Sequence, residues 1–206
     1  MTSSKEQILT AVHRNRPDAA ELPDLNGEWT RYPDRRQQFV DVLQSVGGQA
    51  FIARGQADLV DQLQRLPNYS EMQKIASLVP GVDSSNFDWS AIDSPHALAN
   101  VDLAILPGEF AVAENAAVWV TDRKLPQRVL YFLCQHLVLV VPADQIVDHL
   151  HAAYELLAAS ERRGSPPPAP AFGAFISGPS KTADIEQALV IGAHGPRSLT
   201  VCLLDE

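Results

Sequence analysis

The sequence predicts an α/β protein with a mostly parallel sheet and helices on both faces of that sheet. Short apolar runs of strand character alternate along the chain with segments in which apolar residues recur at helical spacing. The run HLVLVV at 136–141 is apolar at nearly every position, as expected for a strand that is covered on both faces. Alternation of strands and helices favours parallel pairing.

The individual elements follow from the same two patterns. Amphipathic spacing predicts helices, and β-branched or aromatic content predicts strands. Helices are expected over 34–46, 56–66, 126–135 and 143–160, and strands over 49–53, 73–81, 101–106, 116–122, 136–141, 174–176 and 199–204.

A separate helix is expected at the N-terminus. Ser3 or Ser4 can cap it, and Glu6 or Gln7 can complete a capping box. The stretch 17–33, rich in Pro, Asp, Asn and Gly, reads as an extended connector. We therefore divide the chain into an N-terminal helix and connector, 1–35, and an α/β domain, 36–206.

Composition narrows the classes of partner. The chain has 206 residues, 46% of them hydrophobic and 20% charged, which is typical of a folded domain. A net charge of -9 without a basic cluster argues against nucleic acid and anionic lipid as partners. The start of the chain lacks the apolar stretch of a signal peptide, and the longest apolar run, 137–142, is too short to cross a bilayer. These features predict a cytoplasmic protein without a membrane span.

The most unusual chemistry lies in FISGPSKTADIEQALVIGAHGPRSLTVCLL, residues 175–204. Its pattern predicts a strand, a Gly-Pro-Ser turn, a short helix, a second glycine-rich turn and a last strand, which together make a βαβ unit. The first turn would then lie at the carboxyl end of a sheet strand, where such folds bind ligands and where helix N-termini attract anions. The candidate ligand-binding residues are Gly178, Ser180, Lys181, Thr182, Asp184, His194, Gly195 and Arg197.

A purely structural interpretation competes with this one. Ser180 or Thr182 can simply cap the helix, and Asp184 can complement its dipole. On physical grounds alone, capping is the simpler interpretation. His194 between two glycines is harder to explain as a core residue.

Other candidate residues point in different directions. Glu109 and Glu114 flank a strand-like stretch, and either could be a nucleophile or acid–base group, or a strand-end acid facing solvent. No Walker loop, GxGxxG or GxSxG motif occurs. His149 and His151 would point to different faces of a helix, so no metal site is expected. The two cysteines, Cys134 and Cys202, cannot supply the four thiolates that an iron–sulfur cluster usually needs.

The C-terminal stretch resembles the signature of the lactate utilization protein C family, the LUD domain. The resemblance is carried by SGPSKTADIE, GAHGP and the closing LTVCLL, and more weakly by SSKEQIL, FVDVLQSVGG, AVAENAAVWV and HLVLVVPADQIV. It covers nearly the whole chain. It implies a fold similar to the NagB/RpiA/CoA-transferase class.

The resemblance also implies a role in bacterial growth on L-lactate, beside two iron–sulfur partner proteins that help to oxidise lactate to pyruvate. The first hypothesis is therefore a subunit without a cluster that binds a small carboxylate or phosphate. The second is an acyl- or CoA-transferase that uses Glu114, since Glu114-Asn115 resembles the SENG-like stretch of CoA transferases, although Ala116 stands where a glycine is common. The third is a ligand-sensing or structural module. The catalytic candidates are Glu114 and His194; whether this chain is itself catalytic, which cofactor it uses and whether it forms a homo-oligomer are left open by the sequence.

Overall fold

The fold is built on a central sheet of five parallel strands. The structure is a computed structural model that describes residues 3–21, 23–25, 27–82, 86–123, 125–162, 170–182 and 190–205. The strand order in this sheet is β1-β11-β6-β3-β2. Its strands are β1 (Gln49–Arg54), β2 (Ile75–Ser77), β3 (Leu103–Pro107), β6 (His136–Pro142) and β11 (Ser198–Asp205).

A second sheet of four strands lies on one face of the first. Its order is β7-β4-β5-β8, and β5 runs antiparallel to both of its neighbours. Its strands are β4 (Phe110–Val112), β5 (Ala117–Thr121), β7 (Ile146–Val147) and β8 (Gly173–Ile176). A short antiparallel pair, β9 (Lys181–Thr182) and β10 (Val190–Ile191), stands apart from both sheets.

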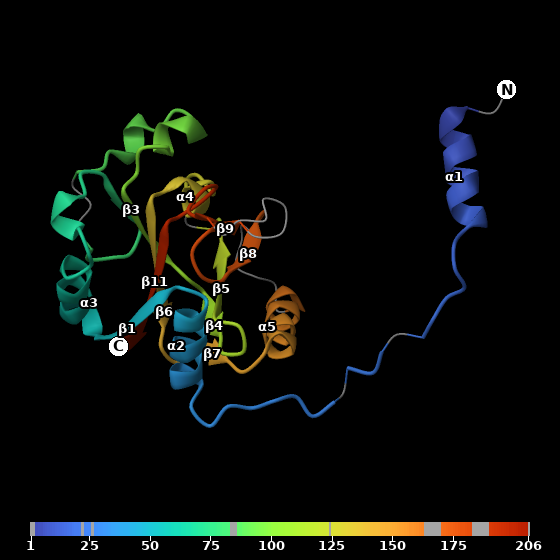
Figure 1. Ribbon diagram of the computed structural model, residues 1–206, viewed down its shortest axis with the longest axis horizontal. Helices are drawn as coiled ribbons and strands as arrows, with labels where there is room; N and C mark the ends of the chain where they lie inside the picture. Colours follow the sequence, from blue (N-terminus) through green and yellow to red (C-terminus); the bar gives the residue numbers. More distant parts are fainter. Residues whose placement is uncertain are drawn as a thin grey trace.

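Five α-helices accompany these strands in the described part of the chain. They are α1 (Ser4–Arg14), α2 (Arg35–Ser45), α3 (Gly55–Gln64), α4 (Leu130–Leu133) and α5 (Leu150–Arg162). Figure 1 shows α3 and α5 on opposite sides of the two sheets, so the domain has four layers. Short 3-10 turns lie at Tyr69–Glu71, Trp89–Ala91 and Pro95–Leu98.

The packing of β6 confirms that this strand is covered on both faces. Leu137, Leu139 and Val141 belong to the core between the two sheets, where Phe39 and Leu43 of α2 also pack. The alternate residues Val138 and Val140 face the other core, which α3 covers with Leu59 and Leu63. Helices therefore lie on both faces of a mostly parallel sheet, as predicted, and the second sheet shares one of these faces with α2.

Several predicted elements differ from the structure. The helix predicted over 126–135 is limited to the four residues of α4, Leu130–Leu133. The helix predicted over 143–160 begins only at Leu150, because Ile146 pairs with Ala111 as part of β7 and is buried there. The predicted final βαβ unit is also wrong in its strand pairing. Strand β8 joins the second sheet, antiparallel to β5, whereas β11 is an inner strand of the parallel sheet. The helix predicted between them lies mostly in 183–189, outside the described residues.

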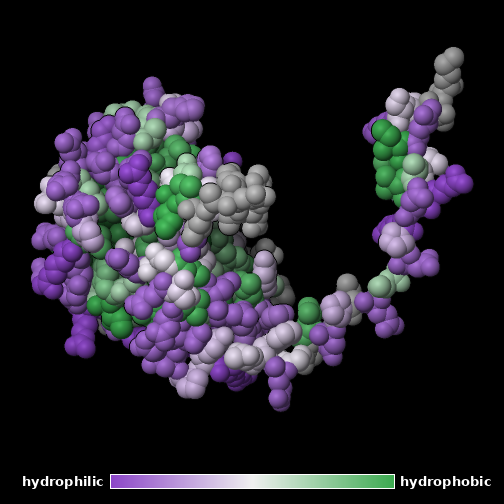
Figure 2. Space-filling view, viewed as in Figure 1, coloured by the Kyte–Doolittle hydropathy of each residue, from purple (hydrophilic) through white to green (hydrophobic). Residues whose placement is uncertain are grey.

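The N-terminal helix has the predicted capping box. The Ser3 Oγ accepts the Glu6 N–H at 3.3 Å, and the Glu6 carboxylate accepts the Ser3 N–H at 2.7 Å. No residue of α1 is buried, and Figures 1 and 2 show the helix away from the sheets with apolar side chains on its surface. The division of the chain at residue 35 stays a prediction. No helix in the described ranges has the length and apolar character needed to cross a membrane.

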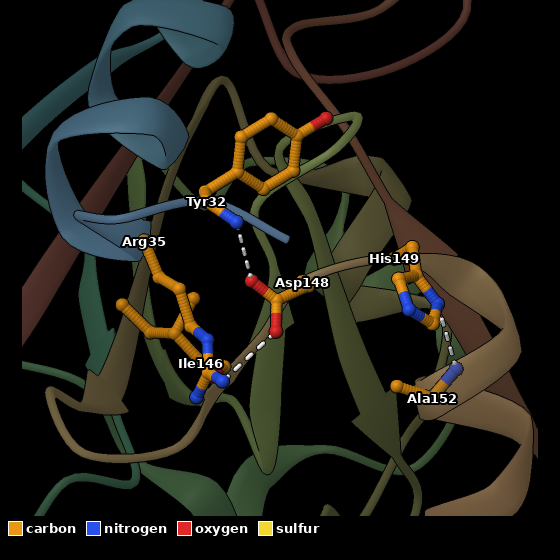
Figure 3. A network of polar contacts seen from close by, with 6 residues as sticks. All are labelled: Tyr32, Arg35, Ile146, Asp148, His149 and Ala152. Atoms are coloured by element: carbon orange, nitrogen blue, oxygen red, sulfur yellow. Dashed lines mark hydrogen bonds and ion pairs between the residues drawn. The ribbon is translucent and has the colours of Figure 1, made fainter. Parts of the chain in front are cut away.

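A buried carboxylate joins the N-terminal connector to the domain (Figure 3). Asp148, which is 6% exposed, accepts the Tyr32 N–H at 2.9 Å and pairs with the Arg35 guanidinium at 2.8 Å. Burial alone would raise the pKa of Asp148, but the Tyr32 N–H and Arg35 together hold it below its ordinary value of 3.8. Earlier in the connector, the Trp29 ring stacks on the His151 ring, with 3.6 Å between the ring centroids.

We predict that Asp148→Asn lowers the free energy of unfolding by about 1–3 kcal/mol at pH 7, because it removes a buried charge-assisted partner. The lowered pKa of Asp148 means that this stabilisation is present above the ordinary value of 3.8 and is lost as the pH falls through the lower folded-state pKa. The difference in the free energy of unfolding between the wild type and Asp148→Asn should therefore become smaller below about pH 4. Urea denaturation at several pH values measures it.

Asp61→Asn is the control, because Asp61 is exposed and pairs with the exposed Arg65 at 3.3 Å. Its effect should stay within about 0.5 kcal/mol at every pH. Equal effects of the two substitutions at pH 7 would contradict the anchoring role of Asp148.

Candidate functional site

The two glycine-rich turns of the C-terminal stretch lie side by side. The Ser180 N–H donates to the Pro196 carbonyl at 3.0 Å, and the Gly192 N–H donates to the Ser180 carbonyl at 2.9 Å. These bonds tie the segment after β8 to the segment before β11. Between them and α4 lies a cavity of about 310 Å³, the C-terminal pocket. Its lining includes five of the predicted residues: Gly178, Ser180, Lys181, His194 and Gly195.

The position of this pocket in the sheet differs from the prediction. Leu137 and Leu199, which also line it, stand at the beginning of β6 and β11. The pocket therefore lies at the amino edge of the parallel sheet. The expected place at the carboxyl edge is wrong because β8, the strand before the first turn, belongs to the antiparallel part of the second sheet. A separate and larger cavity of about 540 Å³ lies at the carboxyl edge.

Two glycines allow the turns to approach their neighbours. Gly178 has φ +72°, and a Cβ there would lie 3.0 Å from the Val46 carbonyl oxygen at the end of α2. At Gly195, a Cβ would lie 3.0 Å from the Ser180 Cβ and 3.2 Å from its Oγ. The glycines thus let the first turn dock on α2 and let the second turn close over Ser180.

Lys181 and His194 supply the basic side chains of the pocket. Both side chains are exposed. The Lys181 Nζ lies 3.7 Å from the point where a Cβ on Gly47 would be, so its charge stands beside the C-terminus of α2. The α2 carbonyls favour a cation there. Lys181 therefore has a structural contact as well as a place in the pocket lining.

Two other predicted ligand residues, Thr182 and Arg197, are not part of the lining of this pocket. The Thr182 Oγ1 accepts the Val190 N–H at 3.1 Å and so links β9 to β10. The Arg197 side chain packs on Gly192, and its N–H donates to the Gln135 carbonyl at 2.8 Å. Asp184 lies outside the described residues.

Arg197 also acts on His136 at the same edge of the sheet. Burial lowers the pKa of His136, and the Arg197 charge lowers it further. The His136 Nδ1 lies 2.7 Å from the Ser198 Oγ. Burial and the Arg197 charge thus both favour the neutral form of His136.

Glu114 has a clear structural contact. Its Oε2 accepts the Leu150 N–H at 3.0 Å, so the carboxylate caps the first turn of α5. The next residue, Asn115, connects this turn to the pocket, because its carbonyl accepts the Ser177 hydroxyl at 2.7 Å and Ser177 lines the pocket. Ala116 follows with φ +53° although it is fully buried. The backbone thus takes the glycine-like conformation even without the glycine.

The thiols are shielded and offer little reactivity. Burial raises the pKa of Cys134 to about 12, and that of Cys202 to about 12 as well. Among the described residues, no three His, Cys, Asp or Glu side chains are grouped as a metal site requires.

Comparison with known proteins identifies the family. The family model of the LUD domain matches residues 36–204. The chain belongs to the LUD domain family. The described fold agrees with a crystal structure of a DUF162 family protein from Deinococcus radiodurans, with a TM-score of 0.55 and 20% identity over 82% of this chain and 96% of that one.

Curated relatives of this LUD domain carry one name. This chain is 29% identical to lactate utilization protein C of Exiguobacterium sp. over 65% of its own length and 59% of that protein. It is 33% identical to lactate utilization protein C 1 of Bacillus mycoides over 51% of this chain and 44% of that protein. The LUD domain chain thus spans about half the length of the curated relatives it matches.

Sequence reasoning missed the aromatic wall of the pocket. Tyr131 and Phe132 of α4 and Phe175 of β8 line it together with Ser177. Tyr131 is buried, whereas its neighbour Phe132 is 41% exposed. The aromatic content of 126–135 was visible in the sequence, but only the close approach of α4 to the C-terminal turns places it beside the pocket.

We predict that Gly178→Ala destabilises this LUD domain more than Gly55→Ala does. Both glycines have positive φ, +72° and +78°, so both substitutions carry the same backbone cost of about 1–2 kcal/mol. Only Gly178 has a neighbour in the way, the Val46 carbonyl oxygen; around Gly55 nothing described lies within 4 Å. Chemical denaturation should show a further loss of about 1 kcal/mol or more for Gly178→Ala. Equal losses would mean that the first turn does not dock on α2.

A second prediction concerns the turn after Glu114. Replacing a buried alanine by glycine removes a methyl group worth about 0.8 kcal/mol and adds chain entropy of about 0.5–1 kcal/mol. At Ala116 the relief of positive φ, about 1–2 kcal/mol, offsets this loss. Ala116→Gly should therefore be nearly neutral, while Ala113→Gly, equally buried, lowers the free energy of unfolding by about 1.5 kcal/mol. Thermal or urea unfolding of the two variants, Ala116→Gly and Ala113→Gly, measures this difference in stability.

Proposed function

We propose that this chain is a component of a bacterial L-lactate utilization system, and that it works with iron–sulfur partner proteins to oxidise L-lactate to pyruvate. The observation that carries the proposal is the likeness of the LUD domain to several curated proteins that are all named lactate utilization protein C. The names concern those relatives, and the chain matches about half of their length.

The role proposed for this chain is binding and not electron transfer. Oxidation of lactate to pyruvate releases two electrons and two protons, so an acceptor is required. The two cysteines of this chain are buried, with raised pKa values, and cannot form a four-thiolate cluster site. The partner proteins would therefore receive the electrons.

The C-terminal pocket is the proposed site for a small carboxylate or phosphate. It combines the Lys181 ammonium, the His194 imidazole and the Ser180 hydroxyl with an apolar wall that includes Phe132 and Phe175. A cavity of about 310 Å³ has room for a three-carbon acid with its water shell. The chain has a net charge of -9, which repels anions in general. The Lys181 ammonium gives the pocket a local positive charge that attracts an anion.

In the described part of the chain, the contacts of Glu114 favour a capping role over the acyl- or CoA-transferase alternative. Its Oε2 already accepts the Leu150 N–H, and the side chain is exposed. A nucleophile needs a free carboxylate oxygen beside a substrate cavity. The third hypothesis, a ligand-sensing or structural module, is tested by the growth experiment below.

We predict that deletion of the gene abolishes growth on L-lactate and spares growth on pyruvate. The wild-type gene should restore growth, whereas His194→Ala or Ser180→Ala should restore it poorly, because each removes a polar group from the C-terminal pocket. His96→Ala is the matched control, since His96 is also exposed and lies on a 3-10 turn outside this pocket. Growth rates on the two carbon sources are the measurement.

Purification of the tagged chain from lactate-grown cells tests the partner claim. Iron–sulfur proteins should co-purify, with their characteristic visible absorption. Full growth of the deletion strain on L-lactate would refute the lactate role. Full rescue by both pocket variants would leave that role intact and remove the pocket from it, as expected of a structural turn.

A further inference from the structure

A cavity lies at the carboxyl edge of the parallel sheet, in the described part of the domain. We call it the carboxyl-edge cavity; its volume is about 540 Å³. Residues at or just beyond the ends of four parallel strands line it, among them Leu78 after β2, Pro107 of β3, Pro142 of β6 and Leu204 of β11. The strand register sets Pro107 beside Val140, and Pro142 beside Leu204. Parallel α/β sheets bind ligands at this edge.

One side of the cavity is polar. It is formed by Glu109 at the start of β4, Thr121 at the end of β5 and Arg123 just beyond it. The Thr121 hydroxyl donates to the Glu109 Oε1 at 3.0 Å, which fixes the carboxylate at the rim. The Tyr131 hydroxyl donates to the Thr121 carbonyl at 3.0 Å. Burial raises the pKa of Tyr131, and the negative charges of Glu109 and Asp122 raise it further, so this phenol stays protonated as a donor.

Arg123 is the unusual group. Its Nε is buried and has no hydrogen-bond partner among the described residues. None of the ion pairs found within the described ranges includes Arg123. Its neighbour Asp122 is engaged elsewhere, because the Asp122 Oδ1 accepts the Ala171 and Phe172 N–H groups. A half-buried guanidinium with an unsatisfied donor is costly, and an anion that reaches it removes the cost.

The carboxylate and the guanidinium share the cavity without pairing to each other in the described structure. A negative and a positive side chain that line one cavity suit a ligand that carries both an anionic group and a hydrogen-bond donor. The anionic part would meet Arg123, and a hydroxyl or ammonium donor would meet the Glu109 carboxylate. The remaining walls are apolar, with Leu78, Val140 and Leu204 among them. A dianion such as a phosphate ester is disfavoured by Glu109 at the same rim.

We infer that the carboxyl-edge cavity is a second small-molecule site, for a carboxylic acid with a donor on the adjacent carbon and an apolar side chain. This chemistry is shared by apolar 2-amino acids and by branched 2-hydroxy acids. Arg123 holds the carboxylate, Glu109 accepts from the donor, and the apolar strand ends bury the side chain. The site lies at the opposite edge of the sheet from the C-terminal pocket, and the inference does not rest on the proposed function.

Isothermal titration calorimetry of the full chain tests the inference with three probes of matched skeleton. L-leucine carries an ammonium donor, L-2-hydroxy-4-methylpentanoate carries a hydroxyl, and 4-methylpentanoate carries neither. At least one of the first two should bind, and it should bind more tightly than 4-methylpentanoate. Arg123→Gln should weaken that binding by roughly tenfold or more. Glu109→Gln should reduce the preference for the donor-bearing probe.

Two controls separate this site from other effects. Arg65→Gln, which alters an exposed arginine of a surface pair, should leave binding unchanged. His194→Ala should also leave it unchanged, which distinguishes this cavity from the C-terminal pocket. Circular dichroism checks that each variant is folded, and Arg123→Lys provides a second, milder variant with intermediate affinity. Absence of binding by both donor-bearing probes, equal binding of 4-methylpentanoate, or full affinity in Arg123→Gln would each overturn the inference.

Discussion

The burial of β6 on both faces is the constraint on which the rest of the domain depends. This strand is paired with β11 on one side and β3 on the other, so its backbone polar groups are satisfied inside the sheet. Its side chains alternate between two cores. A strand in this position requires a layer on each face, and the protein supplies α3 on one face and α2 with the second sheet on the other.

The parallel sheet built around β6 has two chemically different edges. At the amino edge, the pocket is made by turns that cross-link through the Ser180 backbone and by aromatic side chains of α4 and β8. At the carboxyl edge, strand ends supply apolar walls and the end of β5 supplies the charges. The two cavities therefore suit different tasks, with the Lys181 ammonium and the His194 imidazole at one edge and a carboxylate and a guanidinium at the other.

The two glutamates near β4 illustrate how position decides the chemistry of a residue. Glu109 and Glu114 are five positions apart, and the residue pattern alone allowed both the same roles before the family resemblance singled out Glu114. Glu114 lies beyond the end of β4 and caps α5. Glu109 lies at the beginning of β4, next to Thr121, and faces the carboxyl-edge cavity. The strand that separates them sends one carboxylate to a helix N-terminus and the other to a cavity.

The sequence by itself determined the α/β class, the strand at 136–141 with its two covered faces, and the N-terminal capping box, because these depend on local periodicity and on contacts a few residues apart. It also named five residues that line the C-terminal pocket, although it placed the two glycine turns at opposite ends of one helix. Only the tertiary structure decided that β8 leaves the parallel sheet, that Ile146 becomes a strand residue, and that Arg123 and Glu109 line the same cavity. Those outcomes depend on which distant strands pair, and strand pairing is set by packing between layers that no local pattern records.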